Sequence, residues 1–241
     1  SFNALFAKIL DESPDVVGLT STTPAFVNVG KVASFIRQKL PSTSIIIGGA
    51  HVTSSPEKTM QTELFDIGVI SEGEVTVTQL FDNYKSGKFT NLEKVRGIIY
   101  RENDGIRQSE RQPYIQDLDS IPMPARHLFP HPKFYQPTPA SCRRVPYAVL
   151  MTSRGCPSRC TFCDRKVFGE RCRMRSVPSI FEEIEELVSK YGVREIRFFD
   201  DTFTLNKKRV YEICDEFKKR KLGISWTCLP KAQSVDGPLL K

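Results

Sequence analysis

The segment that most constrains the fold of this chain holds three cysteines directly after an apolar run at 147–151. A glycine and a proline flank the first cysteine, so we expect a loop leaving a strand rather than a helix. A short loop can direct its thiolates toward one point, and the spacing predicts a metal site at Cys156, Cys160 and Cys163. Structural zinc usually takes four ligands in two separated pairs, whereas clustered thiolates hold iron–sulfur clusters. A four-iron cluster held by only three thiolates leaves one iron open; a zinc knuckle or a chance group of thiols are the alternatives.

Short apolar runs alternate with amphipathic helical patterns in the first part of the chain, and glycine or hydroxyl residues follow the apolar runs. This order predicts an α/β fold with a doubly wound, Rossmann-like parallel sheet, in which ligands bind beyond the carboxyl ends of the strands. The expected strands are 15–20, 44–47 and 65–70, the expected helices are 2–10, 29–40 and 77–84, and the loops at the ligand edge are 20–23, 48–54 and 72–74. A hairpin over 95–107 should turn at Asp104 and Gly105.

A proline-rich connector leads to a second α/β region. Residues 112–146 hold eight prolines and are typical of an extended connector. Three strand–helix steps after it suit part of a TIM-type (β/α) barrel, whose active site lies at the carboxyl ends of its strands. Besides the run before the cysteines, the expected strands are 193–199 and 224–228, and the expected helices are 180–188, capped by Ser176 or Ser179 and closed by Gly192, and 207–219.

An acidic pair, Asp200 and Asp201, ends the strand expected at 193–199. Two carboxylates at a strand end are suited to hold an ammonium group. The alternative is that they cap the segment that follows. The other acidic cluster, formed by Glu182, Glu183, Glu185 and Glu186, is expected to be a solvated face of its helix.

Composition restricts the partners only weakly. The 241 residues carry a net charge of +7, and nine Lys or Arg lie between Arg143 and Arg175. Such a stretch is compatible with a nucleic-acid footprint, but a solvated basic face is the commoner explanation. No apolar run predicts a transmembrane helix, and the N-terminal stretch has the pattern of an amphipathic helix rather than a signal peptide. Seven cysteines, an odd number, argue against a disulfide framework and fit a reducing cytoplasm.

The chain has three histidines. His51 follows a pair of glycines, and we do not assign it as a metal ligand. His127 and His131 lie in the proline-rich connector and are expected at the surface.

The cysteine segment resembles the signature of the radical S-adenosylmethionine (radical SAM) superfamily, Cys156-x3-Cys160-x2-Cys163 with aromatic Phe162 before the last cysteine. The resemblance implies that the cysteines hold a 4Fe-4S cluster whose fourth iron S-adenosylmethionine chelates, and that electron transfer then yields a 5′-deoxyadenosyl radical. It also implies that Phe162 lies near the adenine. The acidic pair at 200–201 stands where the superfamily usually carries Gly-Gly-Glu, which binds the amino group of S-adenosylmethionine, and this chain departs from that pattern.

The first region resembles the cobalamin-binding domain of methionine synthase and of cobalamin-dependent radical enzymes. The matching stretches are 15–22, Asp-Val-Val-Gly-Leu-Thr-Ser-Thr, and 46–53, Ile-Ile-Gly-Gly-Ala-His-Val-Thr. The resemblance implies that Thr20 contacts the nucleotide tail, with Thr22 also among the cofactor-binding residues. It implies that Gly48 and Gly49 let the tail pass close to the backbone, since no Cβ blocks the approach. The alternative is that the glycines only turn a strand into a loop. The Asp-x-His-x-x-Gly motif that supplies a lower cobalt ligand in some members is not in this chain.

These resemblances divide the chain into three parts. They are a cobalamin-binding domain at 1–110, in which the expected first strand is missing, a proline-rich linker at 111–145, and the N-terminal part of a radical SAM domain at 146–241. We expect a full radical domain to continue past Lys241, so this stretch need not be active by itself.

The leading hypothesis is a cobalamin-dependent radical SAM enzyme similar to class B methylases, which transfers a methyl group to an unactivated carbon. We expect a small-molecule or lipid substrate and an electron donor such as flavodoxin or ferredoxin; nucleic acid is not expected. No catalytic side chain is assigned. The alternatives are a cobalamin-linked radical cyclase or rearrangement enzyme, a radical enzyme that modifies RNA, and a non-catalytic metal-binding module.

Overall fold

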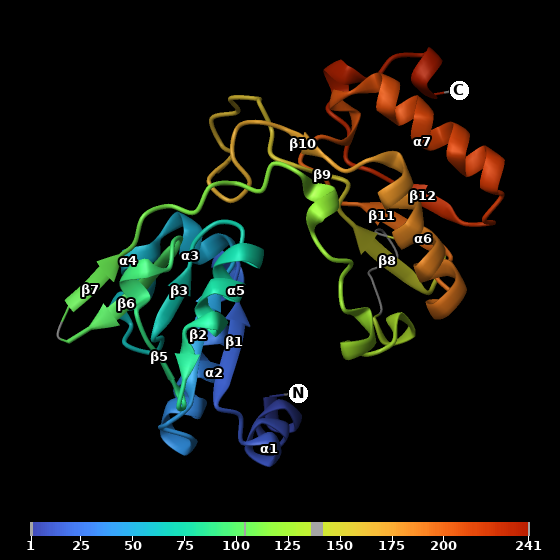
Figure 1. Cartoon of the computed structure of the whole chain (residues 1–241). Helices are drawn as coiled ribbons and strands as arrows, with labels where there is room; N and C mark the ends of the chain where they lie inside the picture. Colours follow the sequence, from blue (N-terminus) through green and yellow to red (C-terminus); the bar gives the residue numbers. More distant parts are fainter. Residues whose placement is uncertain (1, 104, 136–141, 241) are drawn as a thin grey trace. The chain divides into compact units, whose positions relative to one another are not determined.

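Two compact units make up the computed structural model, which describes residues 2–103, 105–135 and 142–240. The first unit comprises residues 1–115 together with 160–168, and the second comprises 116–159 together with 169–241. The chain therefore leaves the second unit for a short segment and then returns to it. Figure 1 shows the helices and strands of each unit.

The first unit is built on a five-stranded sheet with the order β1-β2-β3-β6-β7 (Figure 1). The first three strands of this order run parallel, and the last two are antiparallel to their neighbours. The strands are β1 (Val16–Thr20), β2 (Ser44–Gly48), β3 (Ile67–Val69), β6 (Ile98–Glu102) and β7 (Gly105–Gln108). The α-helices are α1 (Phe2–Glu12), α2 (Phe26–Lys39), α3 (Ala50–Ser54), α4 (Pro56–Gln61) and α5 (Glu74–Asp82), and a small hairpin is formed by β4 (Tyr84–Lys85) and β5 (Lys88–Phe89).

Strand β2 is buried on both faces because its side chains alternate between two hydrophobic clusters. Ile45 and Ile47 pack with residues of α2, such as Ile36, in one cluster. Ile46 packs with Leu80 of α5 in the other. Helices therefore cover both faces of the sheet, which confirms the predicted doubly wound α/β architecture.

The sequence prediction needs small changes near the end of this sheet. Strands β6 and β7 form the hairpin expected over 95–107, with Glu102 opposite Gly105. The expected turn residue Asp104 lies outside the described residues. Helix α5 begins at Glu74, earlier than its apolar pattern indicates, and Tyr84 belongs to β4 rather than to the helix.

The second unit contains a three-stranded parallel sheet with the order β12-β11-β8. Two helices alternate with these strands along the chain, and the sheet does not close on itself, as expected for part of a (β/α) barrel. The strands are β8 (Tyr147–Leu150), β11 (Glu195–Phe198) and β12 (Ser225–Thr227), the helices are α6 (Val177–Tyr191) and α7 (Lys207–Arg220), and a two-stranded ribbon pairs β9 (Ser153–Arg154) with β10 (Arg173–Met174).

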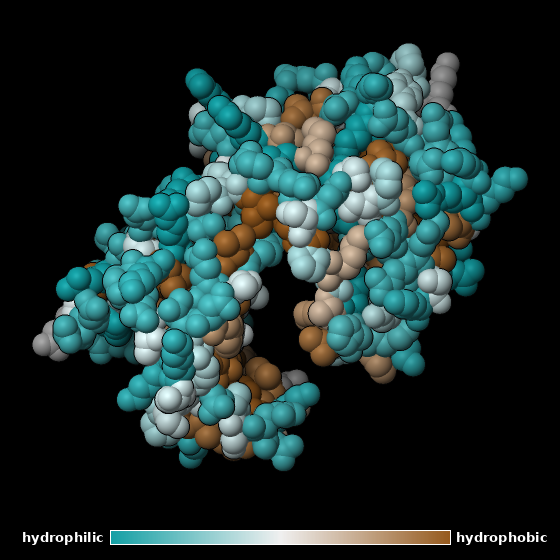
Figure 2. Space-filling view, in the orientation of Figure 1, coloured by the Kyte–Doolittle hydropathy of each residue, from teal (hydrophilic) through white to brown (hydrophobic). Residues whose placement is uncertain are grey.

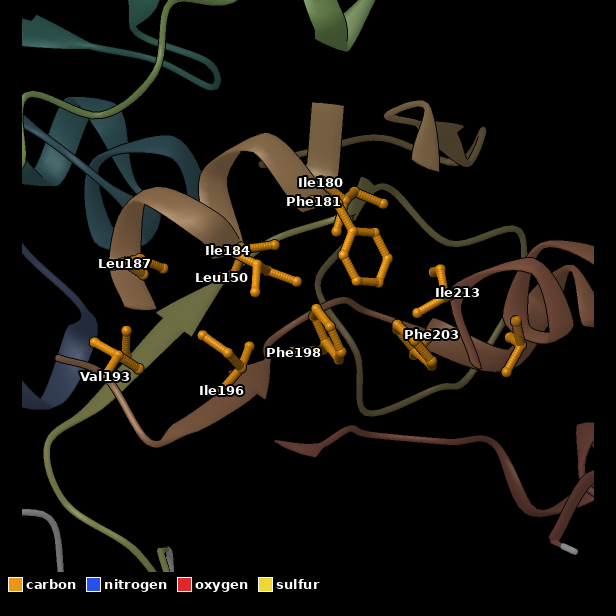
Figure 3. Close-up of a cluster of buried hydrophobic side chains, with 12 residues drawn as sticks. Leu150, Ile180, Phe181, Ile184, Leu187, Val193, Ile196, Phe198, Phe203 and Ile213 are labelled. Carbon is orange, nitrogen blue, oxygen red and sulfur yellow. The ribbon is translucent and has the colours of Figure 1, made fainter. Parts of the chain in front are cut away.

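One hydrophobic cluster joins both helices to the sheet of the second unit (Figure 3). Ile196 and Phe198 of β11 pack with Phe181 of α6, and Phe198 stacks on Phe203 with ring centroids 4.8 Å apart. Helix α6 begins at the predicted cap, where the Ser176 hydroxyl accepts a hydrogen bond from the backbone of Ser179, and it ends at Gly192 with a φ of 62°. The cluster places the carboxyl ends of β8 and β11 next to each other.

The prediction that the glutamates of α6 form a solvated face is wrong for Glu183. Its side chain is only 4 % exposed and forms ion pairs with Arg126 of the connector and Arg175 at the start of the helix. The helical pattern alone could not reveal this, because the two cations come from outside the helix. Glu182 and Glu185 are exposed, and Glu186 is partly exposed.

The visible face of each unit is largely hydrophilic (Figure 2). Among the described residues, none of the helices is both long and apolar enough to cross a membrane.

Candidate functional site

The parallel strands of the first unit end together, as the sequence predicts for a ligand edge. Thr20 at the end of β1 lies opposite Gly48 at the end of β2. Gly49 follows with a φ of 97°, and a Cβ built on it would lie 2.7 Å from Thr20 Oγ1 and 2.8 Å from the carbonyl oxygen of Ser21. No side chain fits there, so Gly49 is required by the shape of the edge. Gly48 is not under the same restriction, because its nearest neighbour would be 3.8 Å away.

Hydroxyl groups line this edge beside one histidine. Thr20 and Thr22 are exposed. Thr23 Oγ1 lies 3.1 Å from Nδ1 of His51, whose ring stacks on Phe26 with centroids 4.0 Å apart. The edge therefore offers exposed hydroxyl groups beside a closely packed turn at Gly49, a surface suited to an extended polar ligand.

In the second unit, a short antiparallel strand pair forms the base of the cysteine loop. Strands β9 and β10 pair directly before and after it, and the backbone of Cys156 donates a hydrogen bond of 3.2 Å to the carbonyl of Gly169. Both Gly155 and Gly169 have positive φ, 86° and 81°, which explains the glycine that the sequence places before the first cysteine. The loop thus leaves the carboxyl end of β8, where the sequence predicts it.

Asp200 holds this base together from the end of β11. Its side chain accepts hydrogen bonds from the backbone of Thr152, at 2.6 Å, from the Thr152 hydroxyl, and from the Ser153 hydroxyl, at 2.8 Å. The residue is only 1 % exposed. Arg209 of α7 donates to the Thr152 carbonyl over 2.7 Å. Burial lowers the pKa of Arg209, while the negative charge of Asp200 counteracts this effect.

The next two residues contact the start of the cysteine loop. Asp201, which is exposed, accepts a hydrogen bond of 3.1 Å from the backbone of Gly155. Although the residue as a whole is exposed, partial desolvation of its carboxyl group raises the pKa of Asp201; the Gly155 hydrogen bond opposes this shift, and the charge of Asp200 adds to it. Thr202 Oγ1 lies 3.3 Å from Cys156 Sγ. Burial acts to raise the pKa of Cys156, but hydrogen bonds from Thr202 and Ser158 outweigh it and hold the pKa below the ordinary cysteine value.

The two later cysteines belong to the first unit. Cys160 and Cys163 are both exposed, and the backbone of Cys163 donates to the carbonyl of Cys160 over 3.1 Å. Phe162 between them is 91 % exposed. All three thiols of the motif are free. Within the described parts of the chain, no three His, Cys, Asp or Glu side chains come close enough together to hold a metal ion.

Two side chains of the basic stretch, those of Arg144 and Arg175, have partners inside the second unit. The backbones of Arg143 and Arg144 donate to the buried Glu195, and the Arg144 guanidinium donates to the Gly223 carbonyl over 2.9 Å. Arg175 pairs with Glu183. The side-chain contacts of Arg144 and Arg175 support a structural role for these two charges.

Sequence reasoning missed several residues around these sites. Thr152 and Ser153 surround Asp200, and Arg209 reaches them from α7. Thr202 follows the acidic pair directly, so its position beside a strand end was a usable signal. Ser54 donates to Asp164, a contact between residues far apart in the chain that no local pattern marks.

Two protein families match the chain. The B12 binding domain family matches residues 3–81, and the Radical SAM superfamily matches residues 150–236. The first match contains the glycine and hydroxyl edge, and the second contains the cysteine motif and the acidic pair. The chain belongs to the proteins that join a B12-binding domain to a radical SAM domain.

Individual relatives have the same arrangement over nearly the whole chain. An uncharacterized methyltransferase, PH0819, of Pyrococcus horikoshii is 39 % identical over 98 % of this chain and 50 % of its own length. The anaerobic magnesium-protoporphyrin IX monomethyl ester cyclase of Rubrivivax gelatinosus is 31 % identical over 91 % of this chain and 39 % of its own length. This chain therefore spans half or less of the length of these relatives.

A solved structure shows the same fold at low sequence identity. The radical S-adenosylmethionine methyltransferase TsrM from Kitasatospora setae, with cobalamin and a [4Fe-4S] cluster bound, superposes with a TM-score of 0.69 at 17 % identity. The match covers 92 % of this chain and 43 % of the other. At this identity the likeness supports the fold of both parts of the chain.

Proposed function

We propose that this chain is the cofactor-binding part of a cobalamin-dependent radical SAM methyltransferase that acts on an unactivated carbon. The observation that carries the proposal is the cysteine motif on a loop that leaves the carboxyl end of β8, with an acidic pair at the end of the neighbouring β11. Three free thiols suit the donor set of a 4Fe-4S cluster with one open iron. The relative PH0819, named a methyltransferase, favours methyl transfer.

Cys156, Cys160 and Cys163 would hold the cluster, with Phe162 near the adenine of S-adenosylmethionine. When bound, the cluster supplies the electron that cleaves S-adenosylmethionine, and cobalamin carries the methyl group. Hydrogen bonds from Thr202 and Ser158 lower the pKa of Cys156, which favours the thiolate form that binds metal.

The two aspartates would have different roles. Asp201 is exposed and is our candidate for holding the amino group of S-adenosylmethionine. Asp200 is buried, and its oxygens already accept hydrogen bonds from Thr152 and Ser153. We therefore assign Asp200 to positioning Asp201 and the base of the loop.

Thr20, Thr22, Gly48 and Gly49 would form the edge that receives the nucleotide tail of cobalamin. Gly49 is the most restricted of the four, because a side chain there would clash with Thr20 and Ser21 and change the shape of this edge. A small-molecule or lipid substrate and a flavodoxin or ferredoxin as electron donor complete the proposal. A reducing cytoplasm suits a chain whose cluster depends on free thiols.

The second candidate is a cobalamin-linked radical cyclase. Its support is the 31 % identity to the Rubrivivax gelatinosus cyclase. Once a substrate is found, the product mass separates the two candidates, because methylation adds one carbon and ring closure adds none.

The decisive experiment is electron paramagnetic resonance of the anaerobically reconstituted, reduced protein, with and without S-adenosylmethionine. We expect a four-iron signal that changes when S-adenosylmethionine is added. Alanine at Cys156, Cys160 or Cys163 should abolish the signal. Cys214→Ala is the matched control, since burial raises the pKa of this thiol of α7 and it lies outside the motif. A four-iron signal retained in any motif variant would refute the ligand assignment.

A further inference from the structure

The segment 160–168 packs with the first unit through a group of side chains that the proposed chemistry does not use. Asp164 Oδ2 accepts a hydrogen bond from the hydroxyl of Ser54, at the end of α3. Its other oxygen accepts from the backbone of Lys166 over 2.9 Å. One carboxylate therefore folds the turn after Cys163 and also ties this turn to α3.

A second tie lies three residues further along the segment. The Ser71 hydroxyl, just after β3, donates to the carbonyl of Val167 over 2.7 Å. The backbone N–H of Ser71 in turn donates a hydrogen bond of 2.9 Å to Thr53 Oγ1. Ser71 is therefore held in place from α3, the same helix that carries Ser54.

A third tie comes from the end of the first unit. The Tyr114 hydroxyl donates to the carbonyl of Lys166 over 2.9 Å, and the Arg111 guanidinium lies 4.6 Å from the centre of the Tyr114 ring. Three separate parts of the first unit thus hold the segment that carries the last two cysteines.

We propose that Ser54, Ser71 and Tyr114, together with Asp164, form a loop anchor that positions Cys160 and Cys163 for the cluster. The cysteines are exposed and contribute little packing of their own, so the hydrogen bonds of the loop anchor fix the backbone that carries them. Ser54 and Ser71 follow β2 and β3 at the proposed cobalamin edge, so this unit would position two of the three cluster ligands. The inference rests on the proposed function only for the identity of the bound cluster.

The first test uses hydrogen exchange in the cluster-free protein, which needs no activity. In Ser54→Ala and Asp164→Asn, peptides covering 160–168 should exchange about fivefold faster than in the wild type, and about tenfold faster when Ser71→Ala is added. Ser54→Thr keeps the hydroxyl and should restore the wild-type rate. Ser42→Ala and Asp82→Asn are matched exposed controls in the first unit and should leave the rate unchanged.

The second test measures how fast a chelator removes iron from the reconstituted protein. The loop-anchor variants should lose the four-iron absorbance several-fold faster than the wild type, and Ser54→Thr should rescue this rate as well. Unchanged exchange in the combined variant would overturn the anchor. Faster exchange with unchanged iron loss would overturn its role in positioning the cysteines. A wild-type protein that takes up no iron at all would overturn the proposed function, and with it this use of the anchor.

Discussion

The two units use the carboxyl ends of their parallel strands in different ways. In the first unit, the ends carry hydroxyls and a glycine whose neighbours leave no room for a Cβ. In the second, they carry carboxylates, one of them 1 % exposed and surrounded by hydroxyl and backbone donors. The first edge is thus defined by shape, and the second by buried charge. An unpaired buried charge costs far more than a local steric adjustment. We therefore expect substitutions of the buried charged residues in the second unit to lower the free energy of unfolding more than substitutions at the edge of the first unit.

The largest effect is expected at Glu183, the buried partner of Arg126 and Arg175. Glu183→Ala leaves two arginines without their shared carboxylate and should lower the free energy of unfolding by about 3–5 kcal/mol. Chemical denaturation measures this loss. The matched control on the same helix is Glu186→Ala, whose partner Lys190 is exposed, with an expected change of about 0.5 kcal/mol. Equal losses in the two variants would contradict the buried ion pairs.

Asp200 should be the next most sensitive position. Asp200→Ala removes the acceptor shared by the Thr152 backbone and the Ser153 hydroxyl, and should cost about 2–3 kcal/mol of unfolding free energy. The exposed neighbour Asp201 provides the control, because Asp201→Ala breaks only the hydrogen bond from Gly155. If Asp201→Ala destabilises the protein more than Asp200→Ala does, the assigned roles of the two residues are reversed.

The sequence predicts the position of these groups better than their roles. The strand–helix order of both units and the helix cap at Ser176 follow from local patterns. The sequence also places Asp200 and Asp201 at a strand end. Which of the two turns inward depends on Thr152 and Ser153 of another strand, so it becomes visible only in the folded chain.

Contacts between distant parts of the chain account for the features that the sequence does not predict. Glu183 follows the exposed Glu182 directly in sequence, and it differs because Arg126 of the connector and Arg175 before the helix pair with it. The pair Ser54 and Asp164 joins residues that no periodic pattern relates. The paired glycines are visible in the sequence. Only the structure shows that a side chain is sterically excluded at Gly49 and not at Gly48.

Gly49→Ala tests the shape-defined edge. The new Cβ would lie 2.7 Å from Thr20 Oγ1 on a backbone with a φ of 97°, so we expect a loss of about 1–3 kcal/mol in unfolding free energy. Weaker cobalamin binding, measured by absorbance titration, should accompany it. Gly48→Ala is the matched control, with its nearest contact at 3.8 Å, and should bind cobalamin nearly as well as the wild type. Identical affinities in all three proteins would remove Gly49 from the proposed site.

The smallest effect concerns pH. The pKa of Asp201 is raised in the folded state by burial, so the folded protein binds this proton more tightly than the unfolded chain does. Stability from this group is present at low pH and is lost as the pH rises from about 4, the ordinary aspartate value, through the raised pKa. Asp201→Asn should remove this part of the decline in denaturant midpoint over the same pH range. A decline of the same size in the variant would show that another group causes it.

The division of the chain into units also limits how its parts can be exchanged between proteins. The first unit is discontinuous, since it takes residues 160–168 from within the sequence of the second. A chimera that transplants residues 1–115 as one piece would leave behind Asp164, the partner of Ser54. Recombination that keeps both units intact must therefore transfer residues 160–168 together with the first unit. Because this segment lies within the sequence of the second unit, we expect the two units to be inherited together.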